Sequence, residues 1–401
     1  MASHKFVIIG AGIMGLSIAR ELQQKGYRDI SIIEKENGIG KHCSGRNSGI
    51  LHSGVYYPED TLKAKFCVNG NQLMRQYADA NAVQYHRTGK VIVCADNSQL
   101  PTLDMLKERG LANHVRVQKI DEYELKQIEP YAKTHEFALF CEDTTVVNPN
   151  EILSTLQAEV TRNGAQIFFC EEVVKVEANN HILHTRQNKH SYDFLINCSG
   201  LQADRIAHMF GVGLQYQIMP FKGVYKKLKK ETASLFHRSI YPVPDLRYPF
   251  LGVHITKNHN GDVYVGPTAI PVFGRENYTG LKGLEVTDFA NISTSLVKMY
   301  FKNENHFRNY VHSEFHNYTH QGFLNSLNLL ADSIQKSDLI DSSKVGIRPQ
   351  LIEKSSLKLV TDFVVERTSN SLHILNAISP AFTCSFSFSS WVVESLFKNP
   401  L

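Results

Sequence analysis

The stretch FVIIGAGIMG (residues 6–15), followed at position 34 by a glutamate, decides the fold of this chain. Its apolar start predicts a buried strand, and the glycines Gly10, Gly12 and Gly15 predict a tight turn into a helix. The first glycine permits the turn, the second lets the backbone approach a pyrophosphate, and the third lets the helix pack closely on the strand. The helix N-terminus then presents free N–H groups to the phosphates. The stretch therefore predicts a dinucleotide-binding unit.

Glu34 closes a second predicted strand, residues 29–33. Its carboxylate can accept hydrogen bonds from both ribose hydroxyls, and it would repel a 2′-phosphate. NADP is therefore disfavoured, whereas the pattern alone does not separate FAD from NAD. The residues expected to contact the dinucleotide here are Gly10, Ala11, Gly12, Ile13, Met14, Gly15, Glu34 and Lys35.

Composition places the chain among globular proteins with a large core. Its 401 residues are 42% hydrophobic, and the formal net charge of +4 is small for this length, so nucleic-acid binding is not expected. The seven cysteines are scattered and lack a C-x-x-C pair, which is typical of reduced intracellular thiols rather than of a disulfide or zinc framework. No run approaches the roughly 20 apolar residues of a membrane-spanning helix. We expect a cytoplasmic protein, with peripheral membrane attachment left open.

Further strand and helix signals are dispersed along the chain. Apolar periodicity predicts a helix over 151–163, strands over 166–169, 173–177 and 194–197, and a helix over 202–210. Residues 216–275 alternate apolar and polar side chains and predict an antiparallel sheet, whereas 284–341 is expected to be mostly helical. Residues 371–396 predict a strand, a turn and a closing helix.

This order predicts an α/β protein in which a discontinuous Rossmann-like domain carries an inserted α+β substrate domain on a mostly antiparallel sheet. The nucleotide domain is expected to comprise 1–83, 145–215 and 342–401, and the substrate domain 84–144 and 216–341.

Residues 43–57, CSGRNSGILHSGVYY, form a second unusual stretch. Small residues alternate there with Arg46, Asn47, His52 and two tyrosines, and a solvent loop seldom carries so many apolar side chains among its glycines. The composition favours chain that passes close to a flat ligand and donates backbone hydrogen bonds. The alternative is a buried strand with a glycine bulge.

These residues, together with the start of the chain, resemble the D-amino-acid-oxidase-like FAD oxidoreductases, and most closely the L-2-hydroxyglutarate dehydrogenase/oxidase family. The resemblance is carried in order by NSGILHSGVYY (47–57), LKAKFCVNG (62–70), LINCSGLQADRIA (195–207), MPFKGVY (219–225), IYPVPDLRYPFLGVHIT (240–256), GPTAIPVFGRENY (266–278), VGIRPQ (345–350) and LHILNAISPAFT (372–383). It implies a bound FAD and oxidation of an L-2-hydroxy dicarboxylate, with L-2-hydroxyglutarate as the expected substrate. Oxygen or a membrane quinone is the expected electron acceptor.

The resemblance also implies roles for individual residues. His52 is the first candidate to accept the substrate's hydroxyl proton or to bind its carboxylate, and His254 is the second. A histidine suits proton removal because its pKa lies near the working pH. Arg348 is the leading carboxylate clamp, since arginine binds carboxylates bidentately. Further substrate contacts are expected from Tyr57, Lys222 and Tyr241.

Further cofactor contacts follow from motif position. They are Ser44, Arg46, Asn47, Ser48 and Gly49, Val173 and Val174 on the adenine side, Ser199 and Gly200, and the turn Ser379, Pro380, Ala381, Phe382 and Thr383. A helix that begins near Thr383 would direct its positive dipole end towards the reduced flavin.

Other functions remain open on the residues alone. An amine or amino-acid oxidase of the same FAD fold is the nearest alternative, followed by an FAD-binding tRNA-modification or regulatory protein and by an NAD-linked dehydrogenase. The basic run at 226–230, KKLKK, is typical of a solvated strand edge, and a second hypothesis is contact with an anionic membrane surface.

Overall fold

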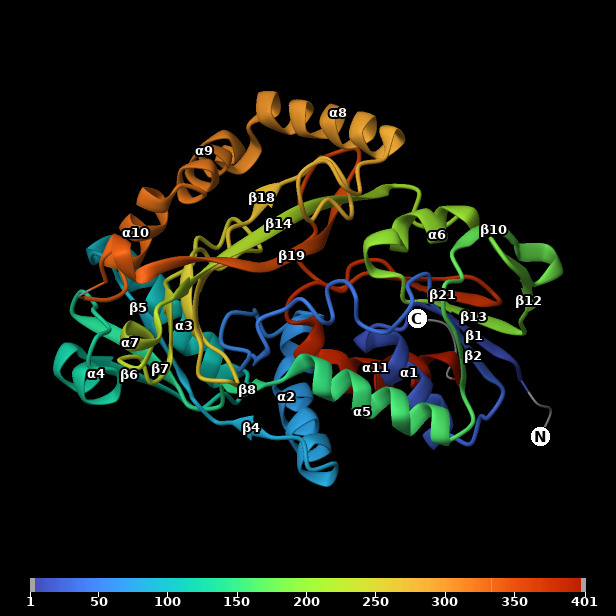
Figure 1. The fold of residues 1–401 in the computed structure, drawn as a ribbon, viewed down its shortest axis with the longest axis horizontal. Helices are drawn as coiled ribbons and strands as arrows, with labels where there is room; N and C mark the ends of the chain where they lie inside the picture. The colour runs from blue at the N-terminus through green and yellow to red at the C-terminus, as the bar shows by residue number, and fades with distance from the viewer. Residues whose placement is uncertain (1–3, 333, 398–401) are drawn as a thin grey trace.

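The computed structural model describes residues 4–332 and 334–397, and two large sheets organise this part of the chain (Figure 1). The first sheet has six strands in the order β20-β21-β13-β1-β2-β9. Five of them run parallel, and β20 pairs antiparallel with β21 at one edge. The strands are β1 Phe6–Ile9, β2 Ile30–Ile33, β9 Gln166–Phe168, β13 Phe194–Asn197, β20 Val365–Arg367 and β21 Ser371–Ile374.

Both faces of the parallel sheet are covered, which explains why β1 is apolar at every position. Phe6 and Ile8 lie in one core with four helices, whereas Val7 and Ile9 pack against a three-stranded sheet and a short helix. The helices of the first layer are α1 Ile13–Gln24, α2 Leu62–Ala80, α5 Pro149–Arg162 and α11 Ala381–Phe397. The second layer consists of α6 Ala203–Met209 with β10 Val173–Glu177, β11 Ile182–Thr185 and β12 Lys189–Ser191. The expected Rossmann-like α/β architecture is confirmed.

The second sheet is mostly antiparallel, as predicted. Its order is β18-β14-β17-β16-β15-β5-β7-β6, and β19 also pairs with β14. Only β5 and β15, among the neighbouring strands of the described residues, run parallel. The strands are β5 Lys90–Val93, β6 Val117–Asp121, β7 Phe137–Cys141, β14 Tyr216–Leu228, β15 Ser239–Pro242, β16 His254–Lys257, β17 Val263–Gly266, β18 Ile270–Pro271 and β19 Leu339–Glu353.

The remaining elements surround this sheet. In the view of Figure 1, three helices of the large sheet's domain follow one another in a row above β14 and β19. They are α8 Val286–Lys302, α9 Phe307–Asn317 and α10 His320–Asn328. The others are α3 Leu100–Ala112, α4 Glu122–Ile128, α7 Lys230–Ala233 and a small sheet of β3 Ile50–Leu51, β8 Thr145–Val147 and β4 Tyr85–His86. Across residues 4–332 and 334–397, no helix combines the length and the hydropathy of a membrane-spanning segment.

One predicted boundary needs correction. The helical segment expected over 284–341 ends at Asn328, and β19 begins at Leu339. Because β19 pairs with β14 along almost its whole length, the boundary expected at residue 342 falls inside a strand of the large sheet. The pairing partner lies far away in the chain, so no local pattern marks it. The other boundaries stay predictions, and their outermost residues, 1–3 and 398–401, lie outside the described part.

Candidate active site

Two adjoining cavities lie between the parallel sheet and the large sheet. The first has a volume of about 220 Å³ and is lined by the 43–52 loop, by β19 and by the turn before α11. The second has a volume of about 310 Å³ and lies at the ends of β1 and β2. Gly12, Ser44 and Gly200 line both cavities, so together they form one elongated site.

The three glycines of the turn between β1 and α1 and of the first turn of α1 have no room for a side chain. Gly10 has a φ of +103°, and a Cβ there would lie 2.7 Å from the carbonyl oxygen of Cys198. A Cβ on Gly15 would lie 1.9 Å from the carbonyl oxygen of Gly10, which is the close helix–strand approach that the sequence predicted. At Gly12 a Cβ would meet Ser44 Oγ at 2.8 Å. The turn therefore presents bare backbone where the two cavities meet.

Glu34 is buried at the end of β2 and lines the second cavity. One carboxylate oxygen accepts the N–H of Ala11 at 2.8 Å, and the other accepts the N–H of Glu36 at 2.9 Å. These two bonds hold the carboxylate beside the glycine turn, and an acidic side chain at this place in a dinucleotide-binding unit is the group that bonds a ribose hydroxyl.

Most of the predicted cofactor residues line the cavities. The first cavity is lined by Gly12, Ile13, Met14, Ser44, Arg46, Asn47, Ser48, Gly200, Ser379, Pro380, Ala381, Phe382 and Thr383. The second is lined by Gly10, Gly12, Glu34, Lys35, Ser44, Val173, Val174, Ser199 and Gly200. Ala11, Gly15 and Gly49 line neither of them. Gly49 instead has a φ of +77°, and a Cβ there would lie 2.4 Å from the carbonyl oxygen of Val147, so the turn itself requires a glycine.

His52 follows β3 directly and lines the first cavity. Its N–H donates to Thr383 Oγ1 at 3.0 Å, and its carbonyl accepts the Asn71 side chain at 3.1 Å, so its backbone is held from two helices. The ring atom Nδ1 is buried and has no hydrogen-bond partner among the described residues. Burial, assisted by the charge of Lys90, lowers the pKa of His52 to about 3. The imidazole is therefore neutral at physiological pH.

His254 begins β16 on the other side of the same cavity. Its Nδ1 lies 2.8 Å from the carbonyl oxygen of Gly252. Since a carbonyl can only accept, Nδ1 carries the hydrogen and Nε2 keeps a free lone pair. The ring stacks on Tyr241, with centroids 4.0 Å apart and planes 17° apart. Burial lowers the pKa of His254 to about 3, and the charges of Arg348 and Lys90 act in the same direction.

Arg348 lies on β19 and lines the first cavity with the two histidines and Tyr241. Within the described residues its guanidinium makes one hydrogen bond, from Nη1 to the carbonyl oxygen of Thr268 at 3.1 Å. It also lies 5.5 Å from the centre of the Phe250 ring. Most of its donors therefore remain available to an anionic ligand.

Two predicted substrate residues do not line the cavity. The ammonium of Lys222 on β14 donates to the carbonyl oxygen of Asn277 at 3.1 Å. Tyr57 packs beneath α2, where the ammonium of Lys63 lies 5.8 Å from its ring centre. Motif position alone did not show that these contacts hold the two side chains outside the cavity lining.

Lys90 is a residue that the sequence reasoning missed. It is fully buried at the start of β5, and its ammonium has no hydrogen-bond partner among the described residues. The ammonium lies 4.0 Å from the ring centre of Tyr56 and 5.0 Å from that of Tyr241, which in turn stacks on His254. Burial lowers the pKa of Lys90 to about 8. A lysine at the head of the apolar run KVIV is normally a solvated strand end, so its sequence gave no signal.

The residues present fit FAD. The glycine turn, where added Cβ atoms would clash, matches the approach of a pyrophosphate, and Glu34 matches a ribose. The first cavity adds a largely apolar wall and the unpartnered, buried Nδ1 of His52, which is a polar group that a ligand would satisfy.

Comparisons with known proteins agree with this geometry. The family model described as FAD dependent oxidoreductase matches residues 5–395. The chain is 35% identical to an L-2-hydroxyglutarate dehydrogenase of Indibacter alkaliphilus, covering 98% of each chain. It is 31% identical to the mitochondrial L-2-hydroxyglutarate dehydrogenase of Homo sapiens, covering 98% of this chain and 89% of that protein.

Solved structures show the same fold. L-α-glycerophosphate oxidase from Mycoplasma pneumoniae, solved with FAD bound, superposes with a TM-score of 0.78 at 19% identity, covering 100% of this chain and 96% of that one. Glycine oxidase from Geobacillus kaustophilus gives a TM-score of 0.73 at 15% identity, covering 99% and 95%. Because the family model matches residues 5–395 and a relative 35% identical covers 98% of the chain, the chain belongs to the FAD dependent oxidoreductase family.

Proposed function

We propose that this enzyme oxidises L-2-hydroxyglutarate to 2-oxoglutarate, with FAD as the hydride acceptor. The names of the relatives support this substrate. The observation that carries the proposal is that Arg348, His52 and His254 line one cavity, which the 43–48 loop and the 379–383 turn also line. That cavity combines a cation for a carboxylate with two neutral imidazoles for a hydroxyl proton.

Binding of a dicarboxylate requires compensation for its two negative charges. Moving an ion into a partly dry cavity costs several kcal/mol unless cations or hydrogen bonds compensate. Arg348 offers a fork of donors at the wall of the cavity, and the buried ammonium of Lys90 adds positive charge behind Tyr241. We assign one substrate carboxylate to Arg348.

The hydroxyl proton must leave the substrate as C2 is oxidised. FAD, when bound, supplies N5 of its ring as the acceptor of the C2 hydride. His254 holds a free lone pair on Nε2 because Nδ1–H donates to Gly252, and His52 is held neutral by burial. We propose that His52 takes the proton, and that His254 and Tyr241 form the opposite wall.

The electron acceptor in this proposal is oxygen or a membrane quinone. The basic run 226–230 gives limited support to membrane contact, because Lys226 pairs with Asp341 and Lys227 with Asp262. Mixing reduced enzyme with oxygen or with a soluble quinone, and timing flavin reoxidation in each case, separates the two acceptors.

Anaerobic titration tests the substrate assignment. L-2-Hydroxyglutarate should bleach the absorbance of the flavin chromophore at roughly 450 nm. D-2-Hydroxyglutarate, L-lactate and L-malate should bleach it more slowly or not at all. Glycine and other amino acids serve as the test of the amine-oxidase alternative. Bleaching by an amino acid and not by L-2-hydroxyglutarate would overturn the proposal.

The kcat/KM of flavin reduction should not fall as the pH drops through the ordinary pKa of histidine. With the pKa of both imidazoles at about 3, the proton-accepting forms are fully populated at pH 5 and above and are lost only as the pH falls towards 3. An exposed histidine, with its pKa at about 6.5, would instead lose activity below neutrality. The kcat/KM of reduction against pH reports the free enzyme. A fall in kcat/KM with an apparent pKa of about 6 to 7 would contradict this assignment of neutral, buried bases.

A further inference from the structure

The loop of residues 274–278, between β18 and α8, crosses from the large sheet's domain to the nucleotide end of the site. Glu276 in this loop lines the second cavity, together with Lys35, His42, Gln202 and Arg205. This is the cavity that Glu34 and Val173 also line, and we assign it to the adenosine half of FAD.

The loop is anchored by a buried arginine. The guanidinium of Arg275 bonds both carboxylate oxygens of Asp204 on α6, at 2.5 and 2.9 Å, and Asp288 on α8 at 3.1 Å. Although burial alone would raise the pKa of Asp204, the Arg275 charge holds it below its ordinary value. Because Arg275 bonds both α6 and α8, it fixes the loop where Glu276 lines the cavity.

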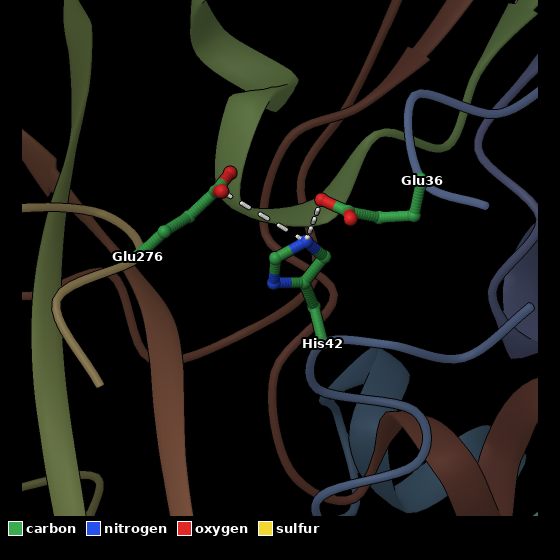
Figure 2. Close-up of side chains that lie close together, drawn as sticks. All are labelled: Glu36, His42 and Glu276. Atoms are coloured by element: carbon green, nitrogen blue, oxygen red, sulfur yellow. Dashed lines mark hydrogen bonds and ion pairs between the residues drawn. The ribbon is translucent and has the colours of Figure 1, made fainter. Parts of the chain in front are cut away.

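A network of charges then joins the loop to the residues that follow β2, and Figure 2 shows the part of it formed by Glu36, His42 and Glu276. The ammonium of Lys35 lies 2.8 Å from Glu276 and 2.6 Å from Glu36. Gln202 donates to Glu276 at 2.9 Å. His42 joins the same network, with Nε2 3.0 Å from Glu36 and 3.9 Å from Glu276.

Tyr278 extends the network towards Arg46 in the 43–52 loop. Its hydroxyl lies 2.8 Å from His42 Nδ1, and the guanidinium of Arg46 lies 4.3 Å from its ring centre. Glu36, His42 and Glu276 are close enough to suggest a metal site, since one atom of each lies within 4.8 Å of the others. Lys35 already supplies the cation between the two carboxylates, so we read the cluster as an ion-pair network.

We propose that residues 274–278 form a clasp that closes the adenosine end of the FAD cavity, and that Glu276 retains the cofactor there. Lys35, His42, Gln202 and Glu276 all line the cavity, so their hydrogen bonds and ion pairs hold the 274–278 loop against its wall. The side chains of Lys35 and Glu276 are each about three-quarters buried, which makes their pairing stronger than that of a surface pair. The inference rests on FAD binding and is independent of the substrate.

The test is the rate of FAD release from Glu276→Gln, which keeps the shape of the side chain and removes its charge. After dilution of the holoenzyme, FAD fluorescence should recover at least fivefold faster than in the wild type. Added salt should speed release from the wild type more than from the variant, because the variant has lost the ion pair. Glu142→Gln is the matched control. It removes a partly exposed carboxylate that pairs with Arg116 at 2.6 Å, and neither residue lines the cavity, so its release rate should equal that of the wild type.

Two results would overturn the clasp. One is equal release from Glu276→Gln and the wild type. The other is an equal loss of thermal stability in apo and holo forms of the variant, which would indicate a purely structural bridge. Should Glu276→Gln fail to fold, Tyr278→Phe carries the test: it removes only the hydroxyl beside His42 and should release FAD about twofold faster, and an unchanged rate would sink the proposal. Release rates keep their meaning even if L-2-hydroxyglutarate proves not to be the substrate.

Discussion

Replacing His52 with alanine should slow reduction of the flavin by L-2-hydroxyglutarate at least tenfold, equivalent to about 1.4 kcal/mol of barrier. A positioned general base contributes roughly 10²- to 10⁴-fold, so a loss near a hundredfold is expected if His52 takes the hydroxyl proton. His52 lines the cavity, is neutral through burial, and is held by its backbone to Thr383 and Asn71. The measurement is the anaerobic reduction rate at saturating substrate in a stopped-flow spectrophotometer.

Two further variants make this result specific. His86→Ala changes an exposed histidine on β4 and should leave the rate unchanged. His254→Ala tests the other imidazole, whose Nε2 lone pair is also able to accept the hydroxyl proton. A larger loss in His254→Ala than in His52→Ala would transfer the proton-accepting role to His254, and unchanged kinetics in His52→Ala would remove His52 from the mechanism.

The Arg348→Met variant should lose about 30-fold to several thousandfold in kcat/KM for L-2-hydroxyglutarate. This range corresponds to the roughly 2–5 kcal/mol lost when one partner of a desolvated charge pair is truncated. The loss should appear mainly as a higher KM, because the carboxylate is bound in the ground state as well as in the transition state. Reduction rates at increasing substrate concentration provide the measurement. Arg348→Lys should recover part of the loss, since it keeps the charge without the bidentate fork.

Arg247→Met is the matched control for Arg348. Arg247 is exposed and pairs with Asp245, so its loss should leave KM unchanged. Comparison with L-lactate identifies the carboxylate that Arg348 binds. If lactate reduction weakens as well, Arg348 holds the carboxylate next to C2; if only L-2-hydroxyglutarate is affected, it holds the distal one. An unchanged KM for both substrates would show that Arg348 is a structural residue.

The nucleotide end of the site was predictable from the sequence because its signals are local. The turn at Gly10 and Gly12, the helix that follows and Glu34 at the end of β2 lie within one short stretch. The partner of β19 was not predictable, since β14 lies far earlier in the chain and neither strand's own sequence indicates which strand it pairs with.

At the substrate end, some of the residues predicted from motif position line one cavity and others do not. His52, Tyr241, His254 and Arg348 come from distant segments and line one cavity, whereas Lys222 points to the backbone of Asn277. A motif shows which residues lie near a site, and only tertiary packing decides which way each side chain points. Lys90 shows the opposite case. Its local sequence suggests a solvated strand end, whereas in the fold it is buried beside the rings of Tyr56 and Tyr241.

The order of strands in the parallel sheet has a consequence for biosynthesis. β13 lies between β1 and β21, and α11, which comes after β21 in the chain, packs against both α1 and α2. A nascent polypeptide therefore cannot complete the nucleotide-binding layer until β21 and α11 have left the ribosome. Such long-range closure is slow and leaves apolar surfaces of the early segments uncovered during translation. Shortened chains that stop before β21 should depend on chaperones and aggregate when these are absent.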